Sequence, residues 1–195
     1  MLYSEVNDML VKRPYNRERA LRYARAWAFS RNPLFYNFTE IGGDCTNFVS
    51  QCVLAGCCAM NYTPDFGWYY LSPNDRAPAF TGVEYFWDFF TGAPAFASVN
   101  GGAGPFGREV SERRAVPGDA VQLGNEEGDF YHTLLVTGRS REGILVAGHS
   151  NDVYDRPLYT YEAPRLRFLH IEGVRAEAKP ADCFEDLIAG RALPR

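Results

Sequence analysis

Cys45 is the residue of this chain whose surroundings most favour nucleophilic chemistry. It follows Gly42, Gly43 and Asp44, and it begins a segment in which apolar residues recur at helical spacing. The free N–H groups and the positive dipole end of a helix start stabilise a thiolate, the reactive form of cysteine, and can also stabilise an oxyanion. The two glycines permit the unusual backbone angles of a turn that presents a nucleophile. We therefore predict that Cys45 is a nucleophile, although most free cysteines are simply buried.

The other four cysteines lack this context. Cys52 lies two helical turns further along the same stripe and is expected in the core. Cys57 and Cys58 are adjacent, so they lack the Cys-x-x-Cys spacing of structural zinc motifs. An odd total of five cysteines, two of them adjacent, is not typical of a disulfide framework and predicts a reducing compartment.

Three histidines are available as partners for the thiol: His132, His149 and His170. His132 opens one strand-like run and His149 closes the next, so a hairpin of the two runs would bring both imidazoles to one end of a sheet. Cysteine catalysis needs a base that takes the thiol proton and a neighbour that fixes the tautomer of that base. The pair His132 and His149 meets this need, whereas His170 is expected to be structural or on the surface.

Two helices are predicted to position these groups. The first begins after Asn16, a suitable N-cap, and ends at Asn32-Pro33. The second runs from Cys45 to about Gly56. Asp44 is expected to support the start of this helix with its side chain turned from the sulfur, because a carboxylate beside the thiol opposes thiolate formation. Asp44 is also a candidate substrate contact.

Residues 61–107 form an excursion that is rich in proline, glycine and aromatic residues. Thr81 and Glu84 have the spacing of a capping box and introduce one periodic segment, which predicts a short helix in a partly irregular stretch. Phe86 and Trp87 lie on the apolar stripe of this helix and are expected to pack inward. Aromatic residues in irregular sequence are the candidates for a substrate groove: Trp68, Tyr69 and Tyr70.

The second half of the chain has the character of a sheet. Strand-like runs at residues 119–123, 133–137 and 144–147 predict an antiparallel meander, and a run at 166–171 extends it. Residues 175–195 are polar enough for a trailing helix or tail. Helices followed by strands predict an α+β fold.

Four motifs resemble the bacterial family named Putative amidase domain: YNR at residues 15–17, GGDCTNFVSQC at 42–52, PGDAVQL at 117–123 and HTLLVTG at 132–138. This family is a papain-like group related to the CHAP and NlpC-type cell-wall amidases and endopeptidases. The resemblance covers most of residues 15–160. It implies a papain-like α+β fold, in which the nucleophile starts a helix that packs on an antiparallel sheet.

The resemblance also implies a role for each site residue. Cys45 would be the nucleophile, His132 the general base, and a polar residue on the following strand the third member. His149 matches that place in NlpC-type relatives, and Asn151 and Asp152 are the alternatives. The implied reaction is amide hydrolysis through a thioester acyl-enzyme, which requires no metal or organic cofactor. The implied substrate is a peptide or a small amide, with peptides of peptidoglycan as one source.

The composition limits partners and organisation. A net charge of -4 and a pI near 5.4 argue against a nucleic-acid partner. No apolar run resembles a signal sequence or a membrane span, so no membrane partner is expected and a cytoplasmic protein is predicted, with export of a trimmed chain left open. The length predicts one domain over residues 1–195. The sequence does not indicate the oligomeric state. Two other functions remain: an acyltransferase or transglutaminase-like enzyme with the same site, and a non-catalytic papain-like binding module.

Overall fold

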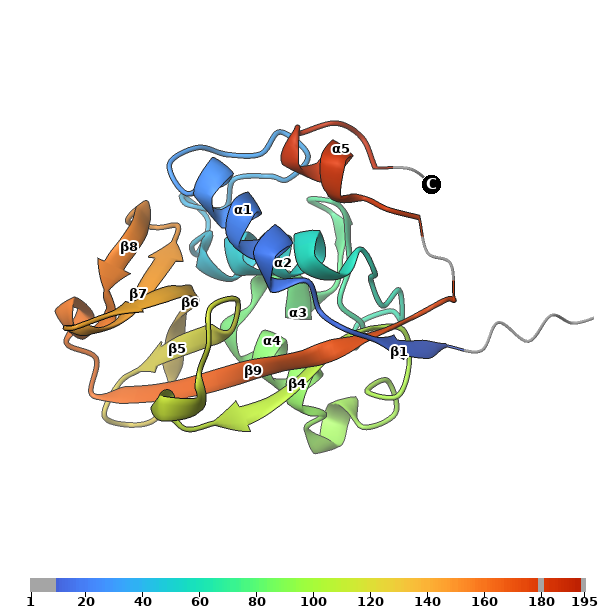
Figure 1. Cartoon of the computed structure of the whole chain (residues 1–195). Coiled ribbons are helices and arrows are strands. Elements are labelled where there is room, and N and C mark those ends of the chain that lie inside the picture. The colour runs from blue at the N-terminus through green and yellow to red at the C-terminus, as the bar shows by residue number, and fades with distance from the viewer. Residues whose placement is uncertain (1–9, 179–180, 194–195) are drawn as a thin grey trace, which may run out of the picture.

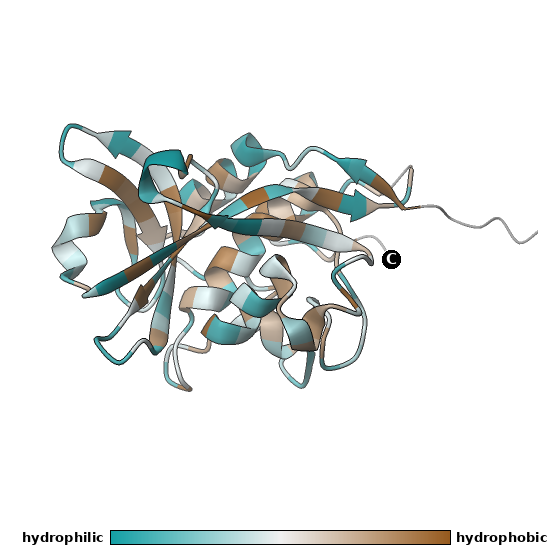
Figure 2. Cartoon of the chain, turned by 90° about the horizontal axis from the view of Figure 1, so that it is seen from below, coloured by the Kyte–Doolittle hydropathy of each residue, from teal (hydrophilic) through white to brown (hydrophobic). Residues whose placement is uncertain are grey.

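The α-helices pack against one face of an antiparallel sheet, so the chain has an α+β fold, as predicted (Figure 1). The computed structural model describes residues 10–178 and 181–193. In Figure 2 hydrophobic stretches of strands and helices lie toward the interior, and the connecting loops are mostly hydrophilic. Burial of these stretches is the main force that holds the helices on the sheet.

The first two predicted helices form close to their expected bounds. The helix α1 (Arg17–Trp27) begins after Asn16, whose side chain accepts a backbone N–H of the first turn, and it ends earlier than predicted. The helix α2 (Cys45–Cys57) begins at the predicted residue and is buried along its whole length. Gly42 and Gly43, directly before it, have φ angles of 90° and 104°, which is the left-handed backbone that favours glycine. The turn before α2 therefore has the character that the sequence predicted.

The helix α4 (Val83–Thr91) is the short helix predicted within the aromatic-rich excursion. The predicted capping box is wrong, because Gly82 occupies the N-cap position and the Glu84 carboxylate instead accepts a hydrogen bond from Arg167. Phe86 is fully buried, as expected. The other elements of this stretch are β2 (Tyr70–Ser72), β3 (Asp75–Arg76), α3 (Pro78–Thr81), the 3-10 helix η1 (Pro94–Phe96) and the start of β4 (Gly104–Val110).

The long strands form one sheet in the order β1-β9-β5-β6-β7-β8, and β4 also pairs with β9. Every pairing is antiparallel, and β5, β6 and β7 are neighbours, which confirms the predicted meander. The strands β1, β4 and β8 were not predicted, and β9 is longer than the run that predicted it. The remaining bounds are β1 (Val11–Arg13), β5 (Ala120–Gly124), β6 (Phe130–Ser140), β7 (Gly143–Gly148), β8 (Val153–Pro157) and β9 (Arg165–Ala176).

The sheet buries apolar side chains on both faces. On the helix face, Leu135 of β6 and Ala147 of β7 belong to the same core as the apolar residues of α2. On the opposite face, Leu134 and Val136 of β6 form a second core that the 3-10 helix η3 (Leu158–Tyr161) helps to cover. Successive residues of β6 therefore point into different cores, as the pleat of a strand requires.

A disulfide joins Cys58, at the C-terminal end of α2, to Cys183, just before the short helix α5 (Phe184–Ile188). The prediction from cysteine count and spacing was therefore wrong for this pair, because the bond connects residues 125 positions apart in the sequence. Cys45, Cys52 and Cys57 are free and buried. Disulfides are typical of oxidising compartments, so cysteine usage no longer supports a reducing one.

Over residues 10–178 and 181–193, no helix combines the length and the apolar character needed to cross a membrane.

Candidate functional site

Cys45 is the first residue of α2, and its side chain is almost buried, at 7% exposure. Burial raises the pKa of the Cys45 thiol, and hydrogen bonds from the backbone of Thr133 and from Thr46 oppose that rise. The Thr46 hydroxyl lies 3.8 Å from the sulfur. The sulfur thus has hydrogen-bond donors that suit an anion, but burial outweighs them, so the net effect on the thiol pKa is opposite to the one predicted for a helix start.

A buried polar chain connects this end of α2 to the sheet. The hydroxyls of Thr46 and Thr133 are 2.9 Å apart, and the Gln122 side chain donates to the Thr133 hydroxyl at 3.2 Å and to the Val83 carbonyl at 2.8 Å. Arg167 then donates to the side-chain amide oxygen of Gln122 at 2.7 Å. The chain fixes β5, β6 and the start of α4 beside Cys45. Sequence reasoning missed Gln122 and Thr133, since Gln122 is one polar residue within the apolar strand β5 and Thr133 directly precedes the apolar run 134–136 of β6.

Within the described residues, no hydrogen bond joins His132 to the Cys45 sulfur. His132 pairs across the sheet with Leu123, a residue of the core on the face opposite to α2. Its ring lies 5.9 Å from the ring of Tyr161, in the 3-10 helix that covers that face. Burial, with the nearby charge of Arg156, lowers the pKa of His132 to about 4. These contacts lie on the side of the second core, and the role of His132 as the base for Cys45 stays a prediction.

Strand register explains why Thr133, and not His132, faces the helices. Leu135 of β6 pairs with Ala147 of β7, and the same register continued by two residues sets Thr133 opposite His149. The two strand ends do lie side by side, as predicted. However, Thr133 faces the helices, so its neighbour His132 must face away from them. Thr133 occupies the place on the helix face where the base was expected.

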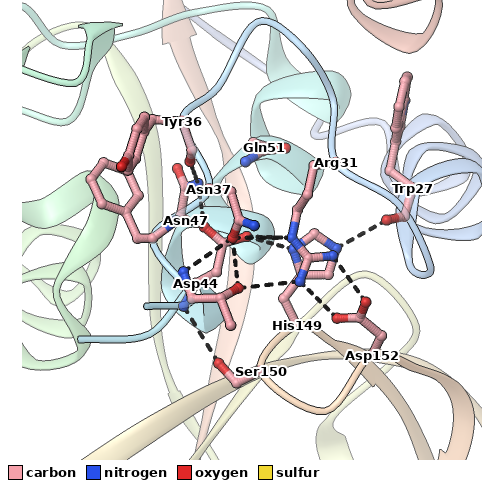
Figure 3. A network of polar contacts seen from close by, with 12 residues as sticks. Trp27, Arg31, Tyr36, Asn37, Asp44, Asn47, Gln51, His149, Ser150 and Asp152 are labelled. Carbon is pink, nitrogen blue, oxygen red and sulfur yellow. Dashed lines mark hydrogen bonds and ion pairs between the residues drawn. The ribbon is translucent and has the colours of Figure 1, made fainter. Parts of the chain in front are cut away.

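His149 lies on the helix face and is held by groups other than His132 (Figure 3). Its Nδ1 is 2.7 Å from the Asp44 carboxylate, and its Nε2 is 2.9 Å from the Trp27 carbonyl oxygen. Its ring stacks on Phe48 with the centroids 4.0 Å apart, and the residue is 1% exposed. The predicted role of His149 as the residue that orients His132 is therefore not supported by its contacts.

Asp44 is fully buried, so its burial does not support the predicted contact with substrate. It occupies the N-cap position of α2 without the usual side-chain cap. Its carboxylate accepts from the Phe38 backbone N–H at 3.1 Å and from the Asn47 side chain at 2.8 Å, and the Arg31 guanidinium lies 3.3 Å away. The carboxylate is thus engaged by four partners, of which His149 is the fourth.

The two alternatives for the third catalytic member lie in the turn between β7 and β8, and both are exposed. Asp152 forms a two-pronged ion pair with Arg31, at 2.9 and 3.1 Å. Burial works against its charge, but the hydrogen bonds and charge of Arg31 hold the pKa of Asp152 below its usual value. No hydrogen bond joins Asn151 or Asp152 to His132 within the described residues. His170, expected to be structural, contacts the Asp119 carboxylate at 2.9 Å.

The predicted aromatic groove is largely wrong. Trp68 is fully buried, and its indole N–H donates to the Ser50 hydroxyl of α2 at 3.1 Å. Tyr70 is also buried, and its hydroxyl accepts the backbone N–H of Tyr36 at 2.8 Å. Tyr69 is only partly buried, with its ring 5.6 Å from that of Tyr62. Trp68 and Tyr70 are core residues, and Trp68 anchors the excursion on α2.

A cavity lies at the other end of α2. It has a volume of about 660 Å³, and its mostly apolar wall includes Leu34, Leu54, Met60, Leu71 and the Cys58–Cys183 disulfide. Leu54 is nine residues beyond Cys45, which is about 14 Å along a helix. Within residues 10–178 and 181–193, no group of three histidine, cysteine or acidic side chains is placed to hold a metal ion.

Comparison with known proteins identifies relatives. A family model described as Putative amidase domain matches residues 14–171. The chain is 29% identical over 168 residues to the uncharacterized protein YhbB of Bacillus subtilis (strain 168), a match that covers 80% of this chain and 50% of the relative. The chain therefore spans about half the length of this relative. No solved structure matches the chain.

Proposed function

This chain belongs to the Putative amidase domain family, and we propose that it hydrolyses an amide bond with Cys45 as the nucleophile. The observation that carries the proposal is the placement of Cys45 as the first residue of the buried helix α2. A sulfur at this position receives N–H donors that stabilise a thiolate, and the same donors can stabilise the oxyanion of an amide under attack. The family description indicates amides as the substrates.

The proposed cycle has two halves. The sulfur attacks the amide carbonyl, the carbon–nitrogen bond breaks, and a thioester forms while the leaving amine takes up the thiol proton. Water then cleaves the thioester, which restores the thiol and releases the acid. The Thr46 hydroxyl and the Thr133 backbone, both beside the sulfur, would hold its geometry during attack. His132 is not assigned as the base, because its ring lies on the other face of β6.

The order of a nucleophile-bearing helix followed by an antiparallel meander supports a papain-like architecture within one domain. The resemblance to CHAP and NlpC-type enzymes supports a peptide substrate, with peptidoglycan fragments as the class to test. The Cys58–Cys183 disulfide argues against the predicted cytoplasmic location, because disulfides are typical of oxidising compartments.

The decisive experiment compares Cys45 with Cys57, a free cysteine of nearly equal exposure, 7% against 8%. Burial raises the pKa of Cys57 to about 12, and its sulfur lacks the helix-start donors. Iodoacetamide labelling at neutral pH, followed by peptide mass spectrometry, should modify Cys45 faster. Incubation with p-nitrophenyl acetate should leave an acetyl group on Cys45 alone. Equal labelling of both thiols, with no acetylated Cys45, would contradict a nucleophilic role.

A second candidate function is a non-catalytic binding module. It is favoured by one observation: within the described residues, no imidazole is hydrogen-bonded to the Cys45 sulfur. Purified peptidoglycan fragments separate the two functions, since an amidase releases new amines while a binding module retains the fragments unchanged. Added glycine ethyl ester tests the acyltransferase alternative, because a transferase would incorporate that amine in preference to water.

A further inference from the structure

Four ionisable side chains meet at the start of α2, and they come from three separate segments (Figure 3). Arg31 follows α1, Asp44 directly precedes Cys45, and His149 and Asp152 flank the end of β7. Asp44 accepts from His149 at 2.7 Å and contacts Arg31 at 3.3 Å, and Arg31 binds Asp152 at 2.9 Å. The cluster thus ties the α1–α2 connection and the β7–β8 turn to the residue next to the nucleophile.

The hydrogen-bond partners of His149 determine which form of the ring fits. Nδ1 faces a carboxylate oxygen and Nε2 faces the Trp27 carbonyl oxygen, and both of these groups only accept hydrogen bonds. A neutral imidazole has one N–H, so one of its nitrogens would direct a lone pair at an acceptor. The imidazolium form donates at both nitrogens. It also balances the cluster, because Arg31 and His149 then face Asp44 and Asp152.

We infer that His149 is an imidazolium that positions the Cys45 end of α2, and that it is not the base of the reaction. This inference rests on the proposed function. Both ring nitrogens are occupied, and the ring is sealed between Phe48 of α2 and the end of α1, so it is not free to accept the thiol proton. The ring instead fixes Asp44, whose backbone is continuous with that of Cys45.

The groups that face His149 come from each element around it. Arg31 and the Trp27 carbonyl lie on the α1 side, Asp44 belongs to the start of α2, and Asp152 lies on the β7–β8 side. The Asp44 backbone N–H also approaches the Ser150 hydroxyl, at 3.4 Å, so the residue after His149 holds the same point of the chain. Loss of the imidazolium would leave Asp44 buried with one strong donor fewer, and α2 would begin less rigidly.

Two measurements test the inference. Nitrogen NMR of the full chain, labelled at histidine and recorded at neutral pH, should show protons on both ring nitrogens of His149. Reactivity of Cys45 toward iodoacetamide should fall about ten- to a hundredfold in His149→Gln, the range typical when a supporting hydrogen bond of a site is removed. His149→Lys should restore part of the loss, because an ammonium group is cationic and can donate to both acceptors. The pH dependence of the residual reactivity should keep its shape in both variants.

His170→Gln is the matched control, since His170 also contacts a buried carboxylate, that of Asp119, but lies outside this cluster, so the change should alter Cys45 reactivity little. A single ring proton on His149 in the wild-type spectrum would overturn the inference. So would loss of one limb of the pH profile in His149→Lys, which would identify a base. If His149→Gln does not fold, as judged by near-ultraviolet circular dichroism, the NMR result and the lysine variant still decide. Absence of Cys45 acylation in the wild type would instead defeat the proposed function and leave the NMR result unaffected.

Discussion

The two faces of β6 differ at adjacent residues, Thr133 and His132. Thr133 faces α2, and its hydroxyl bonds to Thr46 at the start of that helix. His132 faces the second core and lies near Tyr161. The side chains of two adjacent residues therefore lie in different environments, because successive side chains of a strand point to opposite faces of the sheet. Proximity of two strand ends does not by itself bring two chosen side chains together.

The strongest test of this comparison removes one group from each face. Cys45→Ala should abolish hydrolysis of p-nitrophenyl acetate, a loss of about a thousandfold or more for a nucleophile. His132→Ala should retain most of that activity, because its ring does not contact the sulfur in this arrangement. Initial rates at neutral pH measure both. An equal collapse in the two variants would show that His132 reaches the helix face during the reaction.

A matched pair of leucines separates stability from reactivity. Leu134 and Leu135 are both fully buried, but they face different cores. Each substitution to alanine should lower the free energy of unfolding by about 2–5 kcal/mol, measured by urea denaturation. Only Leu135→Ala should also slow the alkylation of Cys45, since Leu135 packs in the core that supports α2. Equal slowing in the two variants would show that the faces are not independent.

The pH dependence of stability should report the environment of His132. Its pKa is about 4 in the folded chain and about 6.5 when exposed, so the unfolded state binds the proton first as the pH falls. Above pH 6.5 His132 is neutral in both states, so it does not lower the free energy of unfolding. Between pH 6.5 and pH 4 this free energy falls progressively, because the unfolded state takes up the proton and the folded state does not. Urea unfolding at pH 7.5 and 4.5 should show a loss of about 2 kcal/mol that His132→Gln removes. An unchanged loss in that variant would contradict the buried neutral ring.

The smallest expected effect concerns the hydroxyl of Thr133. Thr133→Val should cost about 1–2 kcal/mol, because it removes partners of Thr46 and Gln122 within a buried chain. It should also slow Cys45 alkylation several-fold, on the order of one lost hydrogen bond. Thr137→Val on the same strand is the control, because the buried Thr137 hydroxyl has no partner among the described residues. If Thr133→Val is as stable as Thr137→Val, the buried polar chain of Thr46, Thr133 and Gln122 does not support the site.

Local pattern was enough to place Cys45, the proposed nucleophile, at the start of a helix. Helical spacing, the glycines before Cys45 and the position of Asn16 predicted both α1 and α2, because the signals of helix starts and apolar stripes lie within a few residues of each other. The same holds for the meander of β5, β6 and β7, in which short connections join consecutive strands. The family match over residues 14–171 agrees with these motifs.

The facing of His132 could not be predicted from its strand. Leu134, Leu135 and Val136 are all apolar, because both faces of β6 are buried, so the alternation that usually identifies the inner face is missing. The pairing of β5 with β6 is also irregular, since Leu123 pairs with His132 but Gly124 pairs with Phe130. Such a bulge inserts one unpaired residue and changes which side chains share a face.

The sequence by itself determined the helices α1 and α2 and the meander of β5, β6 and β7, since these depend on neighbours along the chain. Tertiary structure decided the partners. Asp44 and His149 are 105 residues apart, and Cys58 and Cys183 are 125 apart, so only the folded sheet and helices bring each pair together. Asp44 was predicted to cap a helix and His149 to orient a base. In the fold the two side chains are buried against each other, and the imidazole gives the Asp44 carboxylate a hydrogen-bond partner, because an unpaired buried carboxylate is costly.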